Sequence, residues 1–186
     1  MIGYAVCGSF CTHKRSLEIL RDLKKNGEDV LPIISPAVEC TDTRFGEAKK
    51  FIEKIEEICG RESVKTIGAA EPLGPSMPLE ALIISPCTGN TMAKIASGIT
   101  DTSVTMAAKA TMRADKPVLI ALASNDALSA NLSNIAALLQ KKNVYFVPMR
   151  QDDIVKKPHS LVAEFELLPN CLELLRQGKQ LRPLFL

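Results

Sequence analysis

The segment SPCTGNT, residues 85–91, gathers side chains that bind polar ligands. It holds three hydroxyl groups, one thiol and one amide around a single glycine. Such donors suit a phosphate group or a flat polar ring. Two plainer interpretations stay open. Asn90 can cap the helix that follows, and Cys87 can be a small packing residue instead of a thiol activated by a helix N-terminus.

Other short polar segments have the same character. Gly8-Ser9-Phe10 combines a flexible backbone, a hydroxyl and amide donors, which favours phosphate at a helix start; a tight turn explains it equally well. Neither a GxGxxG motif nor a P-loop is present. The remaining hydroxyl candidates are Ser35, Ser103 and Thr105. Asp101, which precedes the last two, is expected to cap the next helix. The amides of Asn125 and Asn131 can bind the edge of a heterocycle or stabilise a turn.

No acid–base pair stands out in these segments. The two histidines, His13 and His159, have no neighbour in sequence that would orient them, so no catalytic residue is assigned. The other cations close to the loops in sequence are Lys14, Arg15 and Lys94. We interpret these as solvated helix positions, which leaves a dicarboxylate substrate without a cationic clamp on this chain.

Strands and helices alternate along the chain and must position these loops. Short apolar runs predict strands at residues 2–7, 30–34, 64–67, 81–85, 117–122 and 144–147. Apolar residues at helical spacing predict helices at residues 12–26, 44–59, from about 90, 102–112, 127–141 and 160–177, the last kinked by Pro169. Residues 68–78, GAAEPLGPSMP, are too rich in Gly and Pro for a regular element. This order predicts a three-layer, Rossmann-like or flavodoxin-like parallel sheet with helices on both faces, and the polar loops then meet at its carboxyl edge.

Composition excludes several classes of protein. The 186 residues are 46% apolar and 24% charged, which is typical of a single domain spanning residues 1–186. A net charge of +2 without a basic cluster argues against nucleic-acid binding. No apolar run is long enough to span a membrane and no signal peptide is evident, so we expect a cytoplasmic protein whose six cysteines are reduced. Two histidines and no CxxC pair predict no metal site.

Three segments together resemble a known family. SPCTGNTMAKIASGITDTSVT is similar to a Pro-x-Ser-x-Asn-Thr-x-x-Lys-Ile-x-x-Gly-x-x-Asp signature, GSF resembles a Gly-Ser-Ile phosphate loop, and ALASNDALSAN is similar to an Ala-Pro-Ala-Met-Asn segment. All three belong to the flavoprotein superfamily that includes the homo-oligomeric flavin-containing cysteine decarboxylases. They occur in the family's order and spread over most of the chain.

The resemblance implies FMN as the cofactor and a role for each loop. Near the phosphate or the ribityl chain it places Gly8, Ser9, Phe10 and Ser35. Along the flavin it places Ser85, Cys87, Thr88 and Asn90, with Ser103 and Thr105 contributed by the same or a neighbouring protomer. Asn125 would lie near the pyrimidine-like edge of the ring. The electrons would be carried by the flavin, not by a side chain.

The resemblance also implies partners. It predicts a homo-oligomer built on trimers, in which residues 106–112 form either a contact face or an internal helix. Within the family, the chain resembles more narrowly the flavoprotein subunit of a two-subunit sporulation enzyme of the mother cell. The segments that carry this resemblance are VCGSFCTHKR, TIGAAEPLGP and SNDALSANLSNIAALL. That enzyme forms pyridine-2,6-dicarboxylate from a dihydrodipicolinate-pathway precursor. It is an oxidoreductase whose A subunit resembles a nicotinamide-dependent dehydrogenase and would bring NAD(P).

One departure from the family weighs on function. The decarboxylases carry a catalytic histidine soon after their third strand, where this chain reads KTIGAAEPLGP without a histidine. Decarboxylation is therefore disfavoured. Three functions remain open: an oxidoreductase subunit that works with its A subunit, an FMN-dependent decarboxylase, and a non-catalytic assembly subunit.

Overall fold

A computed structural model describes residues 1–74 and 76–186 of the chain. Its strands are β1 (Ile2–Val6), β2 (Val30–Ile34), β3 (Ala81–Cys87), β4 (Val118–Ser124), β5 (Val144–Phe146), β6 (Met149–Arg150) and β7 (Leu161–Ala163). Its α-helices are α1 (His13–Lys25), α2 (Pro36–Cys40), α3 (Ala48–Cys59), α4 (Ile67–Ala70), α5 (Gly89–Ala96), α6 (Ser103–Arg113), α7 (Leu132–Leu139) and α8 (Leu168–Arg176). Short 3₁₀ helices are η1 (Phe10–Thr12), η2 (Glu71–Leu73) and η3 (Phe165–Leu167).

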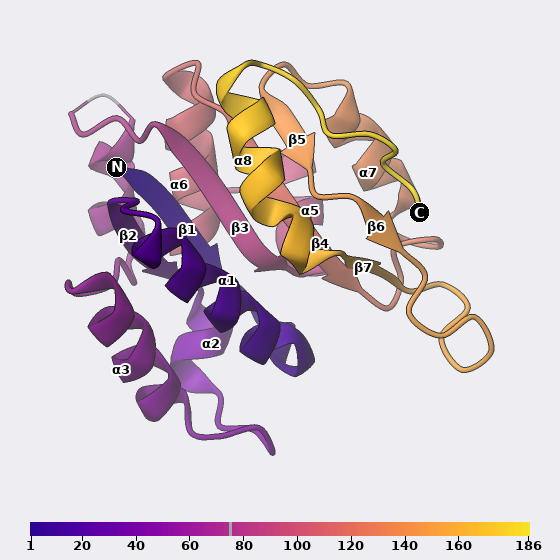
Figure 1. Ribbon diagram of the computed structural model, residues 1–186, viewed down its shortest axis with the longest axis horizontal. Helices are drawn as coiled ribbons and strands as arrows, with labels where there is room; N and C mark the ends of the chain where they lie inside the picture. The colour runs from indigo at the N-terminus through magenta and orange to yellow at the C-terminus, as the bar shows by residue number, and fades with distance from the viewer. Residues whose placement is uncertain (75) are drawn as a thin grey trace.

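The strands form one sheet in the order β2-β1-β3-β4, and β4 is shared by two further neighbours (Figure 1). Its first half, Val118 to Ile120, pairs with β5 in parallel. Its end, Ala123 and Ser124, pairs with β7 antiparallel, and β6 lies beyond β7. The order reverses between β1 and β3, which is the switch point where ligands bind in sheets of this type.

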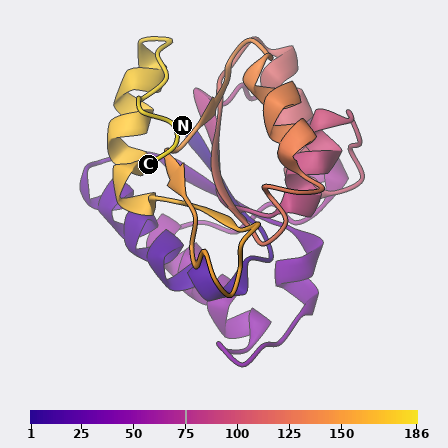
Figure 2. The ribbon, with the colours of Figure 1, turned by 90° about the vertical axis from the view of Figure 1, so that its right-hand side faces the viewer.

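Helices cover both faces of the sheet, so the molecule has three layers (Figure 2). The core cluster on one face contains residues of α1, α3 and α8, and the cluster on the other contains residues of α5, α6 and α7. Strands β1 and β3 are buried along their whole length, as is usual for parallel strands covered on both faces. The predicted three-layer parallel fold is confirmed. No helix of the described residues has the length and apolar character needed to cross a membrane.

The structure corrects several predicted elements. Residues 64–67 form no strand; Val64 makes a single bridge to Ile33. The Gly- and Pro-rich segment begins with α4 and η2, and its residue 75 lies outside the described residues. The tail helix predicted from residue 160 begins only at α8, because residues 161–163 pair as β7. Pro169 stands in the first turn of α8, where its missing N–H costs nothing, and does not kink the helix.

Candidate functional site

A cleft of about 500 Å³ opens at the carboxyl edge of the sheet, beside the switch point. Its walls come from the loops that follow β1, β3 and β4, which the sequence predicted to meet. The lining residues are Gly8, Ser9, Phe10, Cys11, Thr12, Thr88, Gly89, Ala123, Ser124, Asn125 and Asp126, with Arg44, Phe45, Asp152, Lys157 and Val162 at the rim. Of the candidates, Gly8, Ser9, Phe10, Thr88 and Asn125 are thus brought together.

The loop after β1 offers backbone donors to this cleft. The Ser9 hydroxyl donates to the carbonyl of Ala123 at 2.6 Å, which ties the loop to the end of β4. That hydroxyl is therefore committed to the fold. The amide N–H groups of Gly8 and Ser9 make no hydrogen bond within the described part of the chain. Amides in this position, just before α1, suit an anionic ligand.

The start of α5 forms the second wall. Thr88 caps the helix by accepting a hydrogen bond from the amide of Thr91 at 3.1 Å, so the capping role considered for Asn90 belongs to Thr88. Asn90 is exposed and does not line the cleft. A side chain at Gly89 would place its Cβ 2.5 Å from Ser124 Oγ, so a glycine is needed for α5 to abut the loop after β4.

Two candidates on β3 lie inside the protein and not at the cleft. The Ser85 hydroxyl is fully buried, lies 3.1 Å from the hydroxyl of Tyr4, and belongs to a network that includes Ser16. Cys87 is fully buried in the core cluster on the opposite face. Burial raises the pKa of the Cys87 thiol well above its usual value, so the thiolate is disfavoured. The packing interpretation of Cys87 is the one that the structure supports.

A second group of hydroxyls lies where β2 ends and α6 begins. The Ser103 hydroxyl donates to the carbonyl of Ile34 at 2.5 Å. Thr105 forms a reciprocal cap with Thr102, which replaces the cap expected from Asp101. Asp101 pairs instead with Lys94 at 2.7 Å. The hydroxyl of Ser35 is buried and has no hydrogen-bond partner among residues 1–74 and 76–186.

The loop after β4 divides its polar residues between structure and surface. The side-chain amide of Asn131 is buried and donates to Asp126 at 2.8 Å, and the hydroxyl of Ser124 donates to the same carboxylate. Asn131 therefore holds the loop together. Asn125 is exposed at the cleft, where its amide is available to a ligand.

Charged residues at the rim were missed by the sequence analysis. Arg44 stands over the ring of Phe45 at 4.9 Å and has no carboxylate within 4.0 Å among the described residues. Lys157 pairs with Asp152 at 2.5 Å in the loop before β7, which projects from the molecule in Figure 1. Both come from loops far in sequence from the motifs. Of the cations that are near in sequence, Arg15 is paired with Glu166 at 2.7 Å.

These residues fit a ligand with an anionic end and a polar ring. Ser35 does not line the cleft itself, but it lies next to the end of β1, where its amide donates to the carbonyl of Val6 at 3.1 Å. Its orphaned hydroxyl supports a ligand there, because a buried polar group without a partner costs about 1–3 kcal/mol unless something binds it. The unpaired amides of Gly8 and Ser9 add donors. A flavin phosphate would supply hydrogen-bond acceptors for these unpaired donors.

Comparisons with known proteins identify the family. The model of the family described as "Flavoprotein" matches residues 1–164. The B subunit of dipicolinate synthase from Bacillus subtilis (strain 168) is 43% identical over 183 residues, which cover 98% of this chain and 92% of that protein. The crystal structure of the same subunit from Bacillus halodurans C superposes with a TM-score of 0.91 and 41% identity over 100% of this chain and 95% of that one.

A more distant likeness concerns the fold. The FMN-dependent cysteine decarboxylase SpaF has a TM-score of 0.70 at 20% identity, with 95% of each chain covered. Strand order, the cleft at the switch point and the match to residues 1–164 then lead to one conclusion: the chain belongs to the flavoprotein family.

Proposed function

We propose that this chain is the flavoprotein subunit of a dipicolinate synthase. It binds FMN and works with an A subunit that brings NAD(P), and the pair forms pyridine-2,6-dicarboxylate from a dihydrodipicolinate-pathway precursor. The observation that carries the proposal is the similarity to two proteins of that name over nearly the whole chain. The reaction class that we assign is oxidation–reduction, in the mother cell of a sporulating bacterium.

The geometry supports a division of roles among the chain's own residues. Ser35 and the amides of Gly8 and Ser9 would hold the FMN phosphate, and Phe10 would border the ribityl chain. Thr88 and Asn125 would face the flavin, with Asn90 outside the cleft as the chain stands alone. The other predicted residues would support these groups from inside the protein, through the contacts described above; they are Ser85, Cys87, Ser103 and Thr105.

The chemistry that a bound flavin supplies is two-electron oxidation, here of a dihydropyridine ring whose aromatisation favours the step. The chain's residues would bind and orient the ring. Arg44, which has no acidic partner among the described residues, is the cation at this cleft best suited to hold a carboxylate. The chain has no dinucleotide fingerprint, so nicotinamide binding falls to the A subunit.

Product formation tests the proposal. Ultraviolet absorbance of pyridine-2,6-dicarboxylate is followed for this chain, for the A subunit and for their mixture, each with and without FMN. Activity only in the mixture, and only with FMN, is expected. Activity of the mixture without flavin would instead indicate an assembly role for this chain, and full activity of this chain alone would contradict the assigned partnership.

We further propose that the chain forms a homo-oligomer built on trimers. For residues 106–112, the packing favours the internal-helix interpretation over a contact face. Ala107, Ala108 and Ala110 lie in the core, and the partly buried Met106 and Met112 pack against it. Exposed apolar residues elsewhere are better placed to contact a neighbouring protomer. Among them are Ile154 and Val155 on the projecting loop, which are 68% and 83% exposed. Sedimentation equilibrium at micromolar concentration tests this, and a monomer would contradict it.

A further inference from the structure

A second pocket, of about 460 Å³, lies between α1, the segment after α2, and α3. These elements gather at one end of the molecule in Figure 1. The pocket walls are apolar, with Leu17, Val38 and Phe51 among them. Its volume lies in the range of small-molecule sites. Phe10, Cys11 and Phe45 line both this pocket and the cleft, so the two cavities share a wall.

His13 lines this pocket and is held in one orientation. It is only 7% exposed. Its ring stacks on Phe51, with centroids 4.3 Å apart and planes at 11°, and meets Phe10 edge-on at 5.2 Å. Its Nε2 lies 2.8 Å from the carbonyl oxygen of Cys7. Because a carbonyl can only accept, Nε2 must carry the proton.

The other ring nitrogen of His13 is therefore left as an acceptor. Burial lowers the pKa of His13, which favours the neutral ring at neutral pH. In that ring Nδ1 has a lone pair and no proton. No described residue donates a hydrogen bond to it. A ligand in the pocket that carries an N–H or O–H group would satisfy it.

Cations surround the mouth of the pocket. Lys14, Arg21 and Lys54 line it, and none has a carboxylate within 4.0 Å in the described part of the chain. Glu18 is the one acidic residue in the lining. Three positive charges against one negative charge favour an anionic ligand, and the apolar walls favour a ring.

We propose that this pocket binds a six-membered-ring carboxylate bearing an N–H or O–H group, with His13 Nδ1 accepting the hydrogen bond and the three cations holding the carboxylate. The inference rests on the proposed function, because the precursor of pyridine-2,6-dicarboxylate is a partly reduced ring acid of this class. Phe10, Cys11 and Phe45 separate this pocket from the cleft, so the pocket would hold the precursor next to the site where Arg44 and the flavin are proposed to act on it. The aromatic product has no such donor, so the pocket would favour precursor over product.

Calorimetry with two ring acids tests this on the full chain. The probes are pyridine-2,6-dicarboxylate and 4-hydroxypyridine-2,6-dicarboxylate, which carries an N–H or O–H donor in either tautomer. The hydroxylated acid is expected to bind about tenfold more tightly, the equivalent of one hydrogen bond. His13→Phe keeps an aromatic ring on Phe51 but removes Nδ1, and should abolish this preference. His13→Gln keeps an acceptor and should retain part of it.

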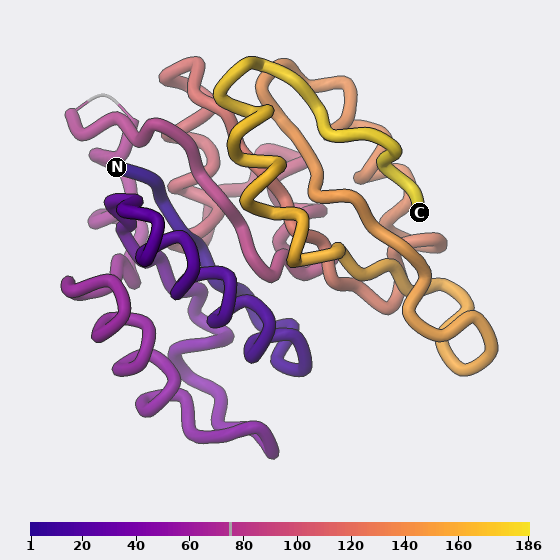
Figure 3. Tube along the Cα trace, viewed as in Figure 1, coloured from indigo at the N-terminus to yellow at the C-terminus, as the bar shows by residue number. Residues whose placement is uncertain are grey.

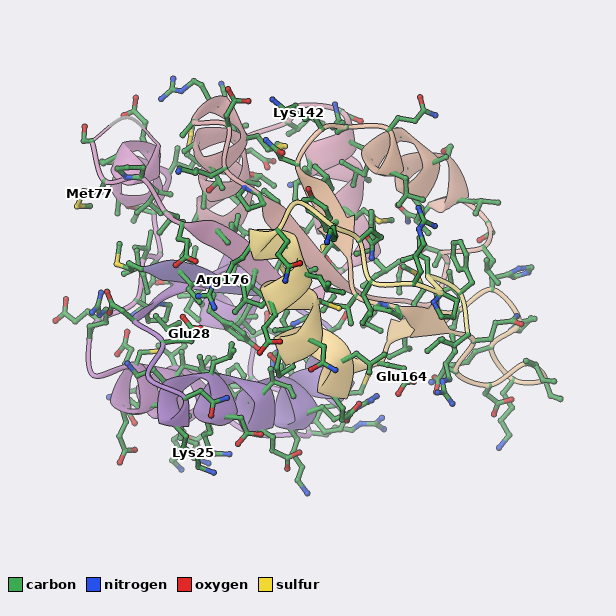
Figure 4. All side chains as sticks on the ribbon, turned by 45° about the horizontal axis from the view of Figure 1, so that its top comes forward. Lys25, Glu28, Met77, Lys142, Glu164 and Arg176 are labelled. Carbon is green, nitrogen blue, oxygen red and sulfur yellow. The ribbon has the colours of Figure 1, made fainter. Side chains whose placement is uncertain are left out.

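A pair of triple variants tests the cations without touching His13. Replacing Lys14, Arg21 and Lys54 by alanine should weaken both probes at least about tenfold. Replacing Lys25, Lys49 and Lys50 removes the same charge from the same two helices outside the pocket, and should change affinity less than about twofold. Figure 4 shows Lys25 on the outer side of its helix.

Several results would overturn the inference. They are the absence of saturable binding, equal affinity of wild type for both probes, a preference that survives His13→Phe, and an equal loss in the two triple variants. FMN binding is titrated in the same preparations. A chain that binds FMN but neither probe contradicts the pocket and leaves the flavin proposal standing; a chain that binds the probes but not FMN does the reverse.

Discussion

At the scale of single residues, Ser35 is the one predicted site residue among the three described residues whose buried hydroxyl has no hydrogen-bond partner, the others being Thr111 and Ser160. If that hydroxyl binds the flavin phosphate, Ser35→Ala should weaken FMN binding by about 1–2 kcal/mol. The flavin-free chain should become more stable to unfolding, by up to about 1–3 kcal/mol, since the substitution removes a buried hydroxyl that has no partner. Flavin fluorescence and urea titrations measure the two quantities.

Ser103 is the matched control. Ser103→Ala breaks the hydrogen bond to the Ile34 carbonyl and should lower the free energy of unfolding by about 1 kcal/mol. Equal effects of the two substitutions on unfolding, or an unchanged FMN affinity in Ser35→Ala, would remove Ser35 from the site.

Thiol reactivity should divide the six cysteines in two. Cys11 and Cys40 are exposed, whereas the other four are buried. Burial raises the pKa of Cys7 and Cys59 to about 11 and that of Cys171 to about 12. An aromatic disulfide reagent at pH 8 should therefore titrate two thiols in the native chain and six in denaturant. A third fast thiol would contradict the buried assignments, above all that of Cys87.

Residue types were predictable at the site, but side-chain directions were not. Ser85 and Cys87 are two apart on β3, a spacing that puts side chains on the same face of a regular strand. The register with β4 shifts between Ile84 and Cys87, and the two side chains turn to opposite faces. A local irregularity of this kind depends on the neighbouring strand, so the alternation of residues along β3 could not reveal it.

At the scale of elements, Gly89 controls how closely α5 approaches the loop after β4. An added methyl group would lie 2.5 Å from Ser124 Oγ and 2.7 Å from Asn131 Nδ2, two atoms that already donate hydrogen bonds to the Asp126 carboxylate. Gly89→Ala should lower the free energy of unfolding by about 1–3 kcal/mol, although alanine is the better helix former. Thermal unfolding measures this, with the exposed Gly68→Ala in α4, where a methyl group meets nothing within 4 Å, as the control. A stabilised Gly89→Ala would show that the loop yields easily.

Arg176 fastens α8 to the amino edge of the sheet, as Figure 4 shows with Glu28. It donates to Glu80 at 2.7 Å and to Glu28 at 2.8 Å. The hydrogen bond from Arg176 holds the pKa of Glu80 below its usual value of 4.5. This contribution to stability is therefore present above about pH 4.5 and is lost as the pH falls through the lower, folded pKa.

Arg176→Met should accordingly cost about 1 kcal/mol at pH 7, because the bridge is partly exposed, and less at pH 3. Urea unfolding at the two pH values measures the difference. Lys142→Met is the control, since Lys142 and its partner Asp115 are both 82% exposed. A cost for Arg176→Met that does not shrink in acid would mean that packing of the arginine stem, not its charge, fastens the helix.

Elements were predictable where local pattern and tertiary contacts agree. The apolar runs of β1 to β5 and the amphipathic α1 and α3 were predicted within a few residues. The tail was not, because residues 161–163 have neighbours at helical spacing and form β7 only through pairing with β4 and β6. Strands of two or three residues, such as β6 and β7, carry too little pattern to be recognised without their partners.

At the scale of the whole molecule, parallel topology explains why the site was largely foreseeable. Once strands and helices alternate, loops distant in sequence must meet at one edge of the sheet. Arg44 and Lys157 escaped this reasoning because they lie in connections that lead to α3 and β7, not in loops that directly follow a core strand. The partners of His13, Cys7 and Phe51, likewise depend on how α1 and α3 pack.

Both edge strands, β2 and β6, are partly covered by a few residues that hydrogen-bond to them without forming a strand. At one edge, Val64 makes backbone hydrogen bonds with Pro32 and Ile34 of β2. On the other, Leu184 and Leu186 bond to Met149 of β6, where the last residues run alongside it in Figure 3. Strand edges with free N–H and C=O groups recruit other chains into aggregates. A chain shortened after Arg182 would lose Leu184 from the margin of the core and uncover β6, and light scattering on warming should then rise at a lower temperature than for the full chain. If that result is obtained, the short apolar tail protects the edge of the sheet from aggregation, a role that is separate from any chemistry in the cleft.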